Sequence, residues 1–340
     1  MKKNDFSKLL TDFLSIYLPS ERNLSTNTLK SYRDTFKQLL IYINKYLKIS
    51  PNRITFDKIT YIQIRNFLDW LEKERKVSIN TRNQRLAAIH SFYNYVQFQR
   101  PDLMYTCQQI LGVRFKKGQR KIIEYLTKYQ LKIIFNQLDI SKIRELRDLT
   151  LMVTLYDTGA RVQELIDLKI MDIRLTEPPT VKLKGKGNKI RNVPIMGRTY
   201  NLLKLYLDKY QLNSNSYLTH PLFFNSNEKP FTRPGITYIL EKYLKKSKIA
   251  NKEINFPEKL TPHILRHTKA IHLLESGVNI IYIRDFLGHV SVKTTERYAR
   301  LNNDLKRKAL EKVYENIIEE KIPNWEENKD LIDWLDDFCK

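Results

Sequence analysis

Apolar residues recur at helical spacing through the first hundred residues of the chain. Four segments carry such a stripe, and short polar stretches with capping residues or proline separate them. The expected helices cover residues 5–18, 23–47, 60–74 and 78–98. Short connections between amphipathic helices favour packing into one small bundle. The pattern therefore predicts an N-terminal helical domain over residues 1–106.

The pattern changes in the second part of the chain. Strict alternation over residues 181–194 surrounds a Gly-Lys-Gly-Asn turn, which is typical of a β-hairpin. Helical periodicity occupies most of the rest. We expect a second domain over residues 124–300, and the whole chain to be mainly α with a small antiparallel β-sheet. The other expected elements are helices at 127–138, 143–156, 197–210 and 233–248 and a short strand at 222–224.

Composition adds a partner class. The hydrophobic and charged fractions, 42% and 29%, are ordinary for a globular protein, but the net charge is +23. A strongly basic protein without a membrane signature most often binds a polyanion. Residues 107–123 contain two glycines and five cations without an acid, so we expect a basic interdomain linker that lies along phosphates.

Other features of the sequence bear on where in the cell the protein is found. The first residues lead into an amphipathic segment, no apolar run approaches membrane length, and two distant cysteines make no disulfide framework. We expect a cytoplasmic protein without a signal peptide or membrane contact. The tail at 301–340 is acidic with scattered apolar residues, and it is expected either to contact a neighbouring subunit or to pack back on its own.

Histidine and arginine gather in one stretch, residues 261–300, which holds four of the six histidines. Thr261 and Pro262 are a helix-start signal, which puts His263 and Arg266 three residues apart on the first turns of a helix. A guanidinium grips two phosphate oxygens, and an imidazole beside it moves protons near neutral pH. These residues predict a phosphate site.

Two further features belong to this stretch. His289 directly follows Gly288 at a predicted helix end, and Tyr298 lies on a further short helix. His263 and His267 also have the i, i+4 spacing of helical zinc ligands, but no glutamate lies between them and Arg266 opposes a cation. We therefore expect no metal, although an isolated histidine or tyrosine is more often structural than catalytic.

The ordered motifs H-I-L-R-H and L-G-H, with a tyrosine nine residues later, resemble the catalytic end of the tyrosine recombinase (phage integrase) family. That family also requires an earlier arginine box and a lysine. The segment L-Y-D-T-G-A-R-V-Q-E-L matches the first and assigns it to Arg161, with Glu164 as supporting acid. The required lysine of the family lies at the tip of a β-hairpin. The predicted hairpin of this chain is similar to that one, and the family's lysine corresponds to Lys186.

The resemblance implies a mechanism without cofactor or metal. Tyr298 attacks the scissile phosphate to form a 3′-phosphotyrosine, Lys186 protonates the leaving 5′ oxygen, and His263 assists proton transfer. It also implies double-stranded DNA as substrate and a tetramer on that DNA. The residues implied to hold the non-bridging oxygens are Arg161, Arg266 and His289.

The N-terminal bundle resembles the core-binding (SAM-like) domain that this family lays across the major groove. Arginine, asparagine and glutamine are the residue types that read base edges there. A solvated helix face is an equally good explanation for any single one of them. The candidate DNA contacts are Lys30, Arg33, Arg82, Arg85 and, on the hairpin, Lys184.

The expected function is therefore site-specific DNA recombination, as an integrase or transposase of a mobile element. Resolution of chromosome dimers by the same chemistry is the alternative. A type IB topoisomerase would not need the N-terminal bundle, and a non-catalytic regulator would not need Lys186, His289 and Tyr298 together. A metal-dependent nuclease would need a carboxylate cluster that the sequence lacks.

Overall fold

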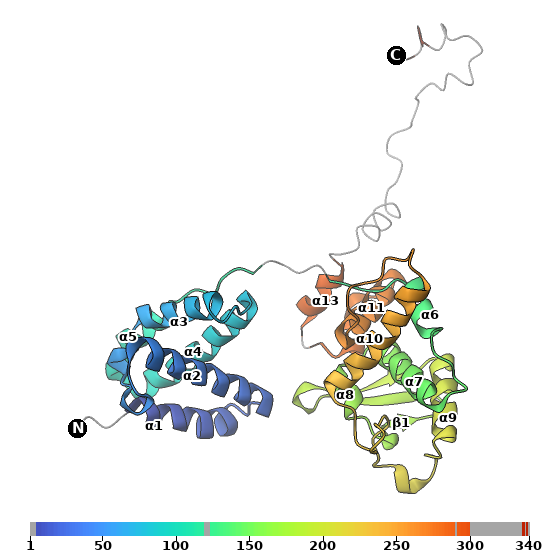
Figure 1. Cartoon of the computed structure of the whole chain (residues 1–340), viewed down its shortest axis with the longest axis horizontal. Coiled ribbons are helices and arrows are strands. Elements are labelled where there is room, and N and C mark those ends of the chain that lie inside the picture. Colours follow the sequence, from blue (N-terminus) through green and yellow to red (C-terminus); the bar gives the residue numbers. More distant parts are fainter. Residues whose placement is uncertain (1–4, 119–122, 290, 300–334, 337, 339–340) are drawn as a thin grey trace. The chain divides into compact units, whose positions relative to one another are not determined.

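The computed structural model describes residues 5–118, 123–289, 291–299, 335, 336 and 338. The chain divides into two compact units, Met1–Lys121 and Ile122–Lys340, and each has its own hydrophobic core. Figure 1 shows helices in both units and a small sheet in the second. Within the described ranges, one three-stranded antiparallel sheet accompanies the helices, which confirms the expected fold class.

The first unit contains the four expected helices and one more. Helix α1 continues without a break into wider, π-type turns that contain Pro19, where the sequence predicted a helix end. Asn23 has a positive φ of 45° and delays the second helix to Thr26. The helices are α1 (Asp5–Asp12), η1 (Phe13–Glu21), α2 (Thr26–Leu47), α3 (Tyr61–Lys73), α4 (Ile79–Gln99) and α5 (Met104–Leu111), with single 3₁₀ turns at Pro51–Arg53, Phe56–Lys58 and Pro101–Leu103.

Aromatic rings fill the centre of the first unit. Phe92 from α4 makes edge-to-face contacts with Phe6, Phe13 and Phe36, at centroid separations of 5.2–5.6 Å. Such pairs add to the stabilisation that burial of their area provides. The helical stripes of the sequence therefore converge on one aromatic core.

Helix α5 corrects the expected linker. The segment from Cys107 was predicted to begin the linker, but Cys107 and Ile110 are fully buried in the first core, and Val113 is 5% exposed. The glycines and cations farther along obscured these apolar positions, which continue the helical spacing of the first unit. The first unit therefore extends well beyond residue 106.

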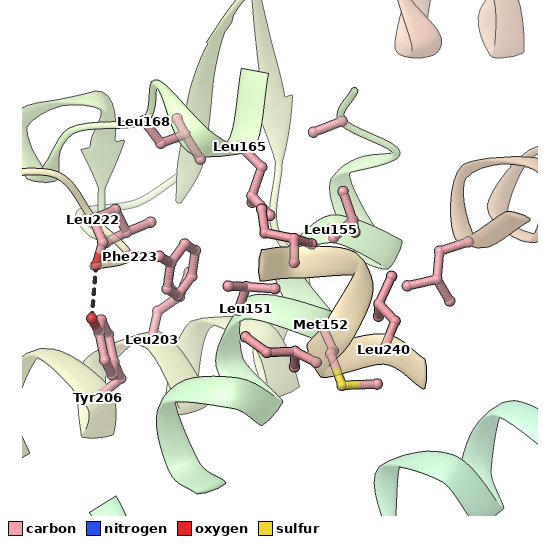
Figure 2. Close-up of a cluster of buried hydrophobic side chains, with 14 of the residues drawn as sticks. Leu151, Met152, Leu155, Leu165, Leu168, Leu203, Tyr206, Leu222, Phe223 and Leu240 are labelled. Atoms are coloured by element: carbon pink, nitrogen blue, oxygen red, sulfur yellow. Dashed lines mark hydrogen bonds between the residues drawn. The ribbon is translucent and has the colours of Figure 1, made fainter. Parts of the chain in front are cut away.

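The second unit is built around helix α7 (Ile143–Thr158). Figure 2 shows its Leu151, Met152 and Leu155 in a core with side chains of α8, α9 and α10. Tyr206 satisfies its buried hydroxyl by donating to the carbonyl of Leu222, 2.7 Å away. The helices of this unit are α6 (Lys128–Phe135), α7, α8 (Val162–Ile166), α9 (Gly197–Lys209), α10 (Arg233–Ala250), α11 (Pro262–Glu275), α12 (Ile280–Leu287) and α13 (Val292–Ala299), with 3₁₀ turns at Ile170–Asp172, Lys186–Asn188 and Asn215–Tyr217.

The sheet has the order β1-β2-β3, from Ile173–Arg174, Thr180–Lys184 and Ile190–Pro194. β2 and β3 form the predicted hairpin, with Val181 opposite Val193 and Lys184 opposite Ile190. The strand predicted at 222–224 is wrong, since Phe224 makes only an isolated bridge to Pro230. Those apolar residues instead fill the core.

None of the helices in the described ranges combines the length and the hydropathy needed to cross a bilayer.

Candidate active site

Arg161 owes its position to a helix break. Helix α7 ends at Gly159, which has φ +57°, and a Cβ there would lie 2.8 Å from a methyl carbon of Leu287. Glycine satisfies both requirements at once. The chain then turns so that Arg161 is the extended residue before the short helix α8.

Glu164 is the carboxylate that fixes Arg161. Its Oε2 accepts the Arg161 backbone N–H at 2.9 Å, and its Oε1 accepts from Nη1 of the same residue at 2.7 Å. Arg191 on β3 pairs with the same carboxylate at 2.7 Å. Burial alone would raise the pKa of Glu164, but hydrogen bonds from Arg191 and from the Arg161 backbone, together with the charge of Arg191, lower it overall. Glu164 is therefore a buried, ionised anchor between two arginines.

Arg266 lies on α11, whose first turn is capped by Thr261. Its side chain is 3% exposed and donates from Nη1 to the carbonyl of Gly159 at 2.6 Å and from Nη2 to that of Leu287 at 2.5 Å. Burial, then the charge of Arg161, lowers the pKa of Arg266 to about 9, which leaves it charged at neutral pH. Each terminal nitrogen keeps a second N–H for an anion.

His289 follows the left-handed Gly288 (φ +63°) that ends α12. Its Nδ1 lies 2.9 Å from the hydroxyl of the buried Thr295. Burial, then the charges of Arg266 and Arg161, lowers the pKa of His289 to about 4. The imidazole is therefore neutral at pH 7, and it lies within the electrostatic range of both arginines.

Tyr298 lies on α13 and is 2% exposed. Its hydroxyl is 2.8 Å from Nδ1 of His267, and its ring lies 6.5 Å from that of His289. His263 is exposed, one helical turn before His267, at a ring separation of 6.3 Å. Two histidines therefore flank the expected nucleophile directly, and the third stacks beside one of them.

Lys186 lies in the turn of the hairpin, which the Gly185 N–H closes by donating to the Lys189 carbonyl at 2.8 Å. A Cβ at Gly185 would lie 3.1 Å from Oε1 of Glu164 and 3.6 Å from Nη1 of Arg161. The turn therefore begins beside the arginines, although the side chain of Lys186 lies outside the described part of the structure.

Both parts of the chain are similar to those of one protein family. Residues 124–304 match the model of the phage integrase family, and residues 10–99 match its N-terminal SAM-like domain. The chain belongs to the phage integrase family. It is 32% identical, over 92% of both chains, to a protein of Sinorhizobium fredii named as an integrase/recombinase (y4rC). It is 30% identical to the tyrosine recombinase XerC of Staphylococcus epidermidis strain RP62A, over 86% of this chain and 92% of that one.

Solved structures of the integrase family share the fold. The Tn1549 transposon integrase in complex with transposon right end DNA matches with a TM-score of 0.68 and 17% identity, over 88% of this chain and 98% of that one. The XerH recombinase bound to a palindromic difH substrate matches with a TM-score of 0.64 and 21% identity, over 86% and 82%. At these identities the likeness concerns the fold, and it agrees with the expected fold class.

The residues expected to contact DNA differ in their exposure to solvent. Lys30, Arg33 and Lys184 are exposed, and Arg33 pairs with the neighbouring Asp34. Arg82 is 5% exposed and donates to the carbonyl of Arg114, so its guanidinium supports the end of the first unit and not a surface. It lies four residues before the buried Leu86 on the apolar face of α4, a signal that the sequence already contained.

Arg85 is also occupied. Its Nη1 donates to the carbonyl of Ser31 at 3.0 Å and to the hydroxyl of Thr35 at 3.1 Å, which ties α4 to α2. The side chain is half-buried. Arg82 and Arg85 therefore act within the first unit in this structure, which differs from the expectation of base contact.

Two residues at the integrase site were missed as functional candidates. His267 was weighed only as a zinc ligand, yet it contacts the Tyr298 hydroxyl. Arg191, on the predicted hairpin, was not among the expected site residues, yet its guanidinium donates to Glu164. Its alternation with the buried Val193 places both on one face of β3, which was the available signal. Among the described residues, no group of three metal-binding side chains gathers.

Proposed function

We propose that the protein is a site-specific DNA recombinase that cuts and rejoins strands through a 3′-phosphotyrosyl intermediate and a Holliday junction. The observation that carries this proposal is the convergence of Arg161, Arg266 and a neutral His289 beside Tyr298. Four separate segments of the chain supply these side chains. Such a set matches a reaction in which the oxygens bound to phosphorus gain negative charge.

In the first step, the phenolic oxygen of Tyr298 forms a bond to the scissile phosphorus, and the bond from phosphorus to the 5′ oxygen breaks. The phenol proton passes to a histidine, with His263 assigned by family resemblance and His267 already in contact with the hydroxyl. Lys186 gives a proton to the leaving 5′ oxygen. One phosphoester replaces another, so the bond energy is kept for rejoining without a nucleotide or a metal.

The arginines contribute through the transition state. The pentacoordinate phosphorus carries more negative charge on its oxygens than the diester, so cations held in place beforehand bind it more strongly. Arg161 is held by Glu164, and Arg266 by two backbone carbonyls. His289 adds a neutral imidazole. With the Thr295 hydroxyl donating to Nδ1, the ring proton lies on Nε2, which is then the donor that His289 offers to a phosphate.

Cleavage also requires that the Tyr298 hydroxyl reach the scissile phosphate. A side chain that is 2% exposed cannot reach a phosphate of a duplex, so α13 must move when DNA binds. We propose that this movement breaks the contact between Tyr298 and His267 and brings the hydroxyl toward the arginines. Cleavage would then depend on correct DNA binding.

The proposed partner is double-stranded DNA at specific sites, with self-association to a tetramer on that DNA. The proposed location is the cytoplasm. A mobile element is the favoured context, as integrase or transposase, and dimer resolution is the alternative. The similar proteins include a transposon integrase and tyrosine recombinases named XerC. The tail at residues 301–340, expected either to contact a neighbouring subunit or to pack back on its own, lies almost wholly outside the described residues.

The test uses supercoiled plasmids that carry tiled segments of the DNA that flanks the gene. A recombinase joins two copies of one segment and leaves the other segments unchanged. Relaxation of every plasmid alike would favour a type IB topoisomerase. Tight binding with neither relaxation nor joining, with the purified chain as sole protein, would favour a regulator.

A further inference from the structure

Arg191 is the one described hairpin cation whose guanidinium is held by the protein interior. Its Nη1 donates to Oε1 of Glu164 at 3.1 Å, its Nη2 to Oε2 at 2.7 Å, and its Nε to the carbonyl of Phe286 at 3.0 Å. The side chain is only 13% exposed. All three nitrogens of the fork therefore have protein partners, which is the geometry that arginine supplies and lysine does not.

The backbone around Arg191 is packed to allow this contact. A Cβ at Gly288 would lie 2.9 Å from Nη1 of Arg191, and a Cβ at Gly185 would lie 3.1 Å from Oε1 of Glu164. Both glycines therefore let backbone approach the ion pair closely. Gly288 immediately precedes His289, and Gly185 immediately precedes Lys186.

Three functional segments thus meet at one guanidinium. Glu164 also holds Arg161, the Phe286 carbonyl belongs to the end of α12 that leads to His289, and Arg191 itself belongs to the strand that follows the hairpin turn. Lys182, Lys184 and Lys189 on the same hairpin are exposed. A shift of the hairpin relative to α8 would have to break two charge-assisted hydrogen bonds in a largely buried place.

We propose that Arg191 is a positioning residue, which fixes the hairpin that carries Lys186 against Glu164 and thereby sets the proton donor in register with Arg161 and His289. This inference rests on the proposed function. The hairpin turn spans five residues between Lys184 and Ile190, and its base is held on one side by Arg191. A proton donor must be within hydrogen-bond reach of the leaving oxygen, so a loosened base lowers the rate of proton transfer first.

The test compares two leaving groups with Arg191→Met as the variant. The substrates are nicked duplexes carrying the site that the wild-type protein cleaves. One has the natural 5′ oxygen at the scissile bond, and the other has sulfur in that place. A thiolate leaves without a proton because its pKa is near 8.5, far below that of an alcohol. We expect Arg191→Met to slow cleavage of the oxygen substrate about 10- to 100-fold, and to leave the sulfur substrate within about threefold of the wild-type rate.

The matched control is Lys184→Met, which removes an exposed cation from the same hairpin. It should change both rates alike and only through DNA binding. Equal slowing of both substrates by Arg191→Met, at saturating DNA, would contradict the proposal, because Arg191 would then act on the phosphate-holding groups. An unchanged rate on the oxygen substrate would contradict it as well.

A second variant tests whether a misfolded protein, and not a displaced hairpin, causes the loss of rate. Arg191→Lys keeps the positive charge beside Glu164 but loses the fork, and it should show the same selective loss on the oxygen substrate to a smaller extent. Thermal melting of each variant separates this effect from unfolding. If the wild-type protein forms no covalent adduct with either substrate, the proposed function fails first, and that result is distinct from a failure of the Arg191 proposal.

Discussion

Arg161 and Arg266 are held by the protein in different ways. Arg161 pairs with the carboxylate of Glu164 and also donates to the carbonyl of Gly288 at 2.9 Å, whereas Arg266 donates to the carbonyls of Gly159 and Leu287. Carbonyl oxygens fix a guanidinium without neutralising its charge. The buried charge of Arg266 is therefore available to an incoming anion, which the lowered pKa of Arg266 also reflects.

We predict that Arg161→Ala lowers the cleavage rate by about 10²- to 10³-fold, the usual loss for one transition-state donor. Its DNA affinity should remain within a few fold of wild type, since one contact among many is lost. Single-turnover cleavage and a binding titration measure the two quantities. Arg174→Ala is the control, because Arg174 is an exposed arginine bonded to Thr176 and Glu177; a comparable loss there would refute the assignment.

His289 gives the free protein a pH dependence with a definite sign. Its pKa falls from 6.5 to about 4 on folding, so the unfolded chain binds the proton more tightly between these values. Its contribution to the free energy of unfolding should thus fall as pH decreases from about 6.5 to about 4, by at most about 3 kcal/mol. Denaturant titrations of wild type and His289→Gln measure this difference. Parallel curves for the two proteins would show that His289 titrates normally.

For individual residues, the sequence predicted the types and the order of the site residues but not their contacts. The motifs gave Arg161, Glu164, Arg266, His289 and Tyr298, and the structure brings these together. The partners of Arg191 and the contact of His267 with Tyr298 depend on segments far apart in sequence. No local pattern encodes such distances.

Two helix ends position the site, and both depend on glycine in the left-handed region. Gly159 ends α7 before Arg161, and Gly288 ends α12 before His289. Helices α11 and α12 also pack against α13, which carries Tyr298. Two of the catalytic candidates, Arg161 and His289, therefore lie just beyond the ends of helices and not on their faces.

We predict that Gly159→Ala lowers the free energy of unfolding by about 2–4 kcal/mol, because the left-handed conformation and overpacking each oppose a side chain. The new Cβ would meet Leu287 at 2.8 Å. Gly197→Ala is the matched control, since it lies at the start of α9 with no atom within 4 Å of the added Cβ. It should change stability by less than about 0.5 kcal/mol. Equal effects of the two substitutions would overturn this account of the break.

Helices were easier to predict than their ends or the short strands. Long amphipathic stripes such as Thr26–Leu47 and the Gly-Lys-Gly-Asn hairpin were expected, and both occur. Helix α5 was missed because a basic, glycine-containing run follows it directly. The apolar run at 222–224 looked like a strand because burial in a core and burial in a sheet give the same short pattern.

The whole molecule combines two compact units with a net charge of +23. Cations that contact phosphates release counterions, so the affinity for DNA should fall steeply with salt. This electrostatic contribution to affinity is the same for any DNA sequence, whereas the site between Arg161 and Tyr298 acts on one phosphate. Affinity and chemistry are therefore expected to respond to different substitutions.

We predict that Lys184→Met reduces the slope of log affinity against log salt by about 1, without loss of stability. Lys184 is exposed on β2, next to the hairpin turn. Lys204→Met, an exposed lysine on α9 that contributes nothing to the site, is the control and should leave the slope unchanged. An unchanged slope for Lys184→Met would remove the hairpin from the DNA contact surface.

Charge, length and periodicity were sufficient to predict two units and a polyanion partner. They did not predict that Arg82 and Arg85 serve the first unit internally, because an arginine on a helix looks the same in sequence whether it faces solvent or a carbonyl. The DNA site, its symmetry and the arrangement of subunits depend on partners that leave no pattern in one chain.

The most direct test of the central claim is formation of a covalent, detergent-resistant complex on nicked duplexes from the DNA that flanks the gene, with wild type beside Tyr298→Phe. The account predicts an adduct for wild type at one position, and none for Tyr298→Phe, which should bind the same duplex with nearly equal affinity because only the hydroxyl is removed. An adduct of equal yield with Tyr298→Phe would contradict the assignment of the nucleophile.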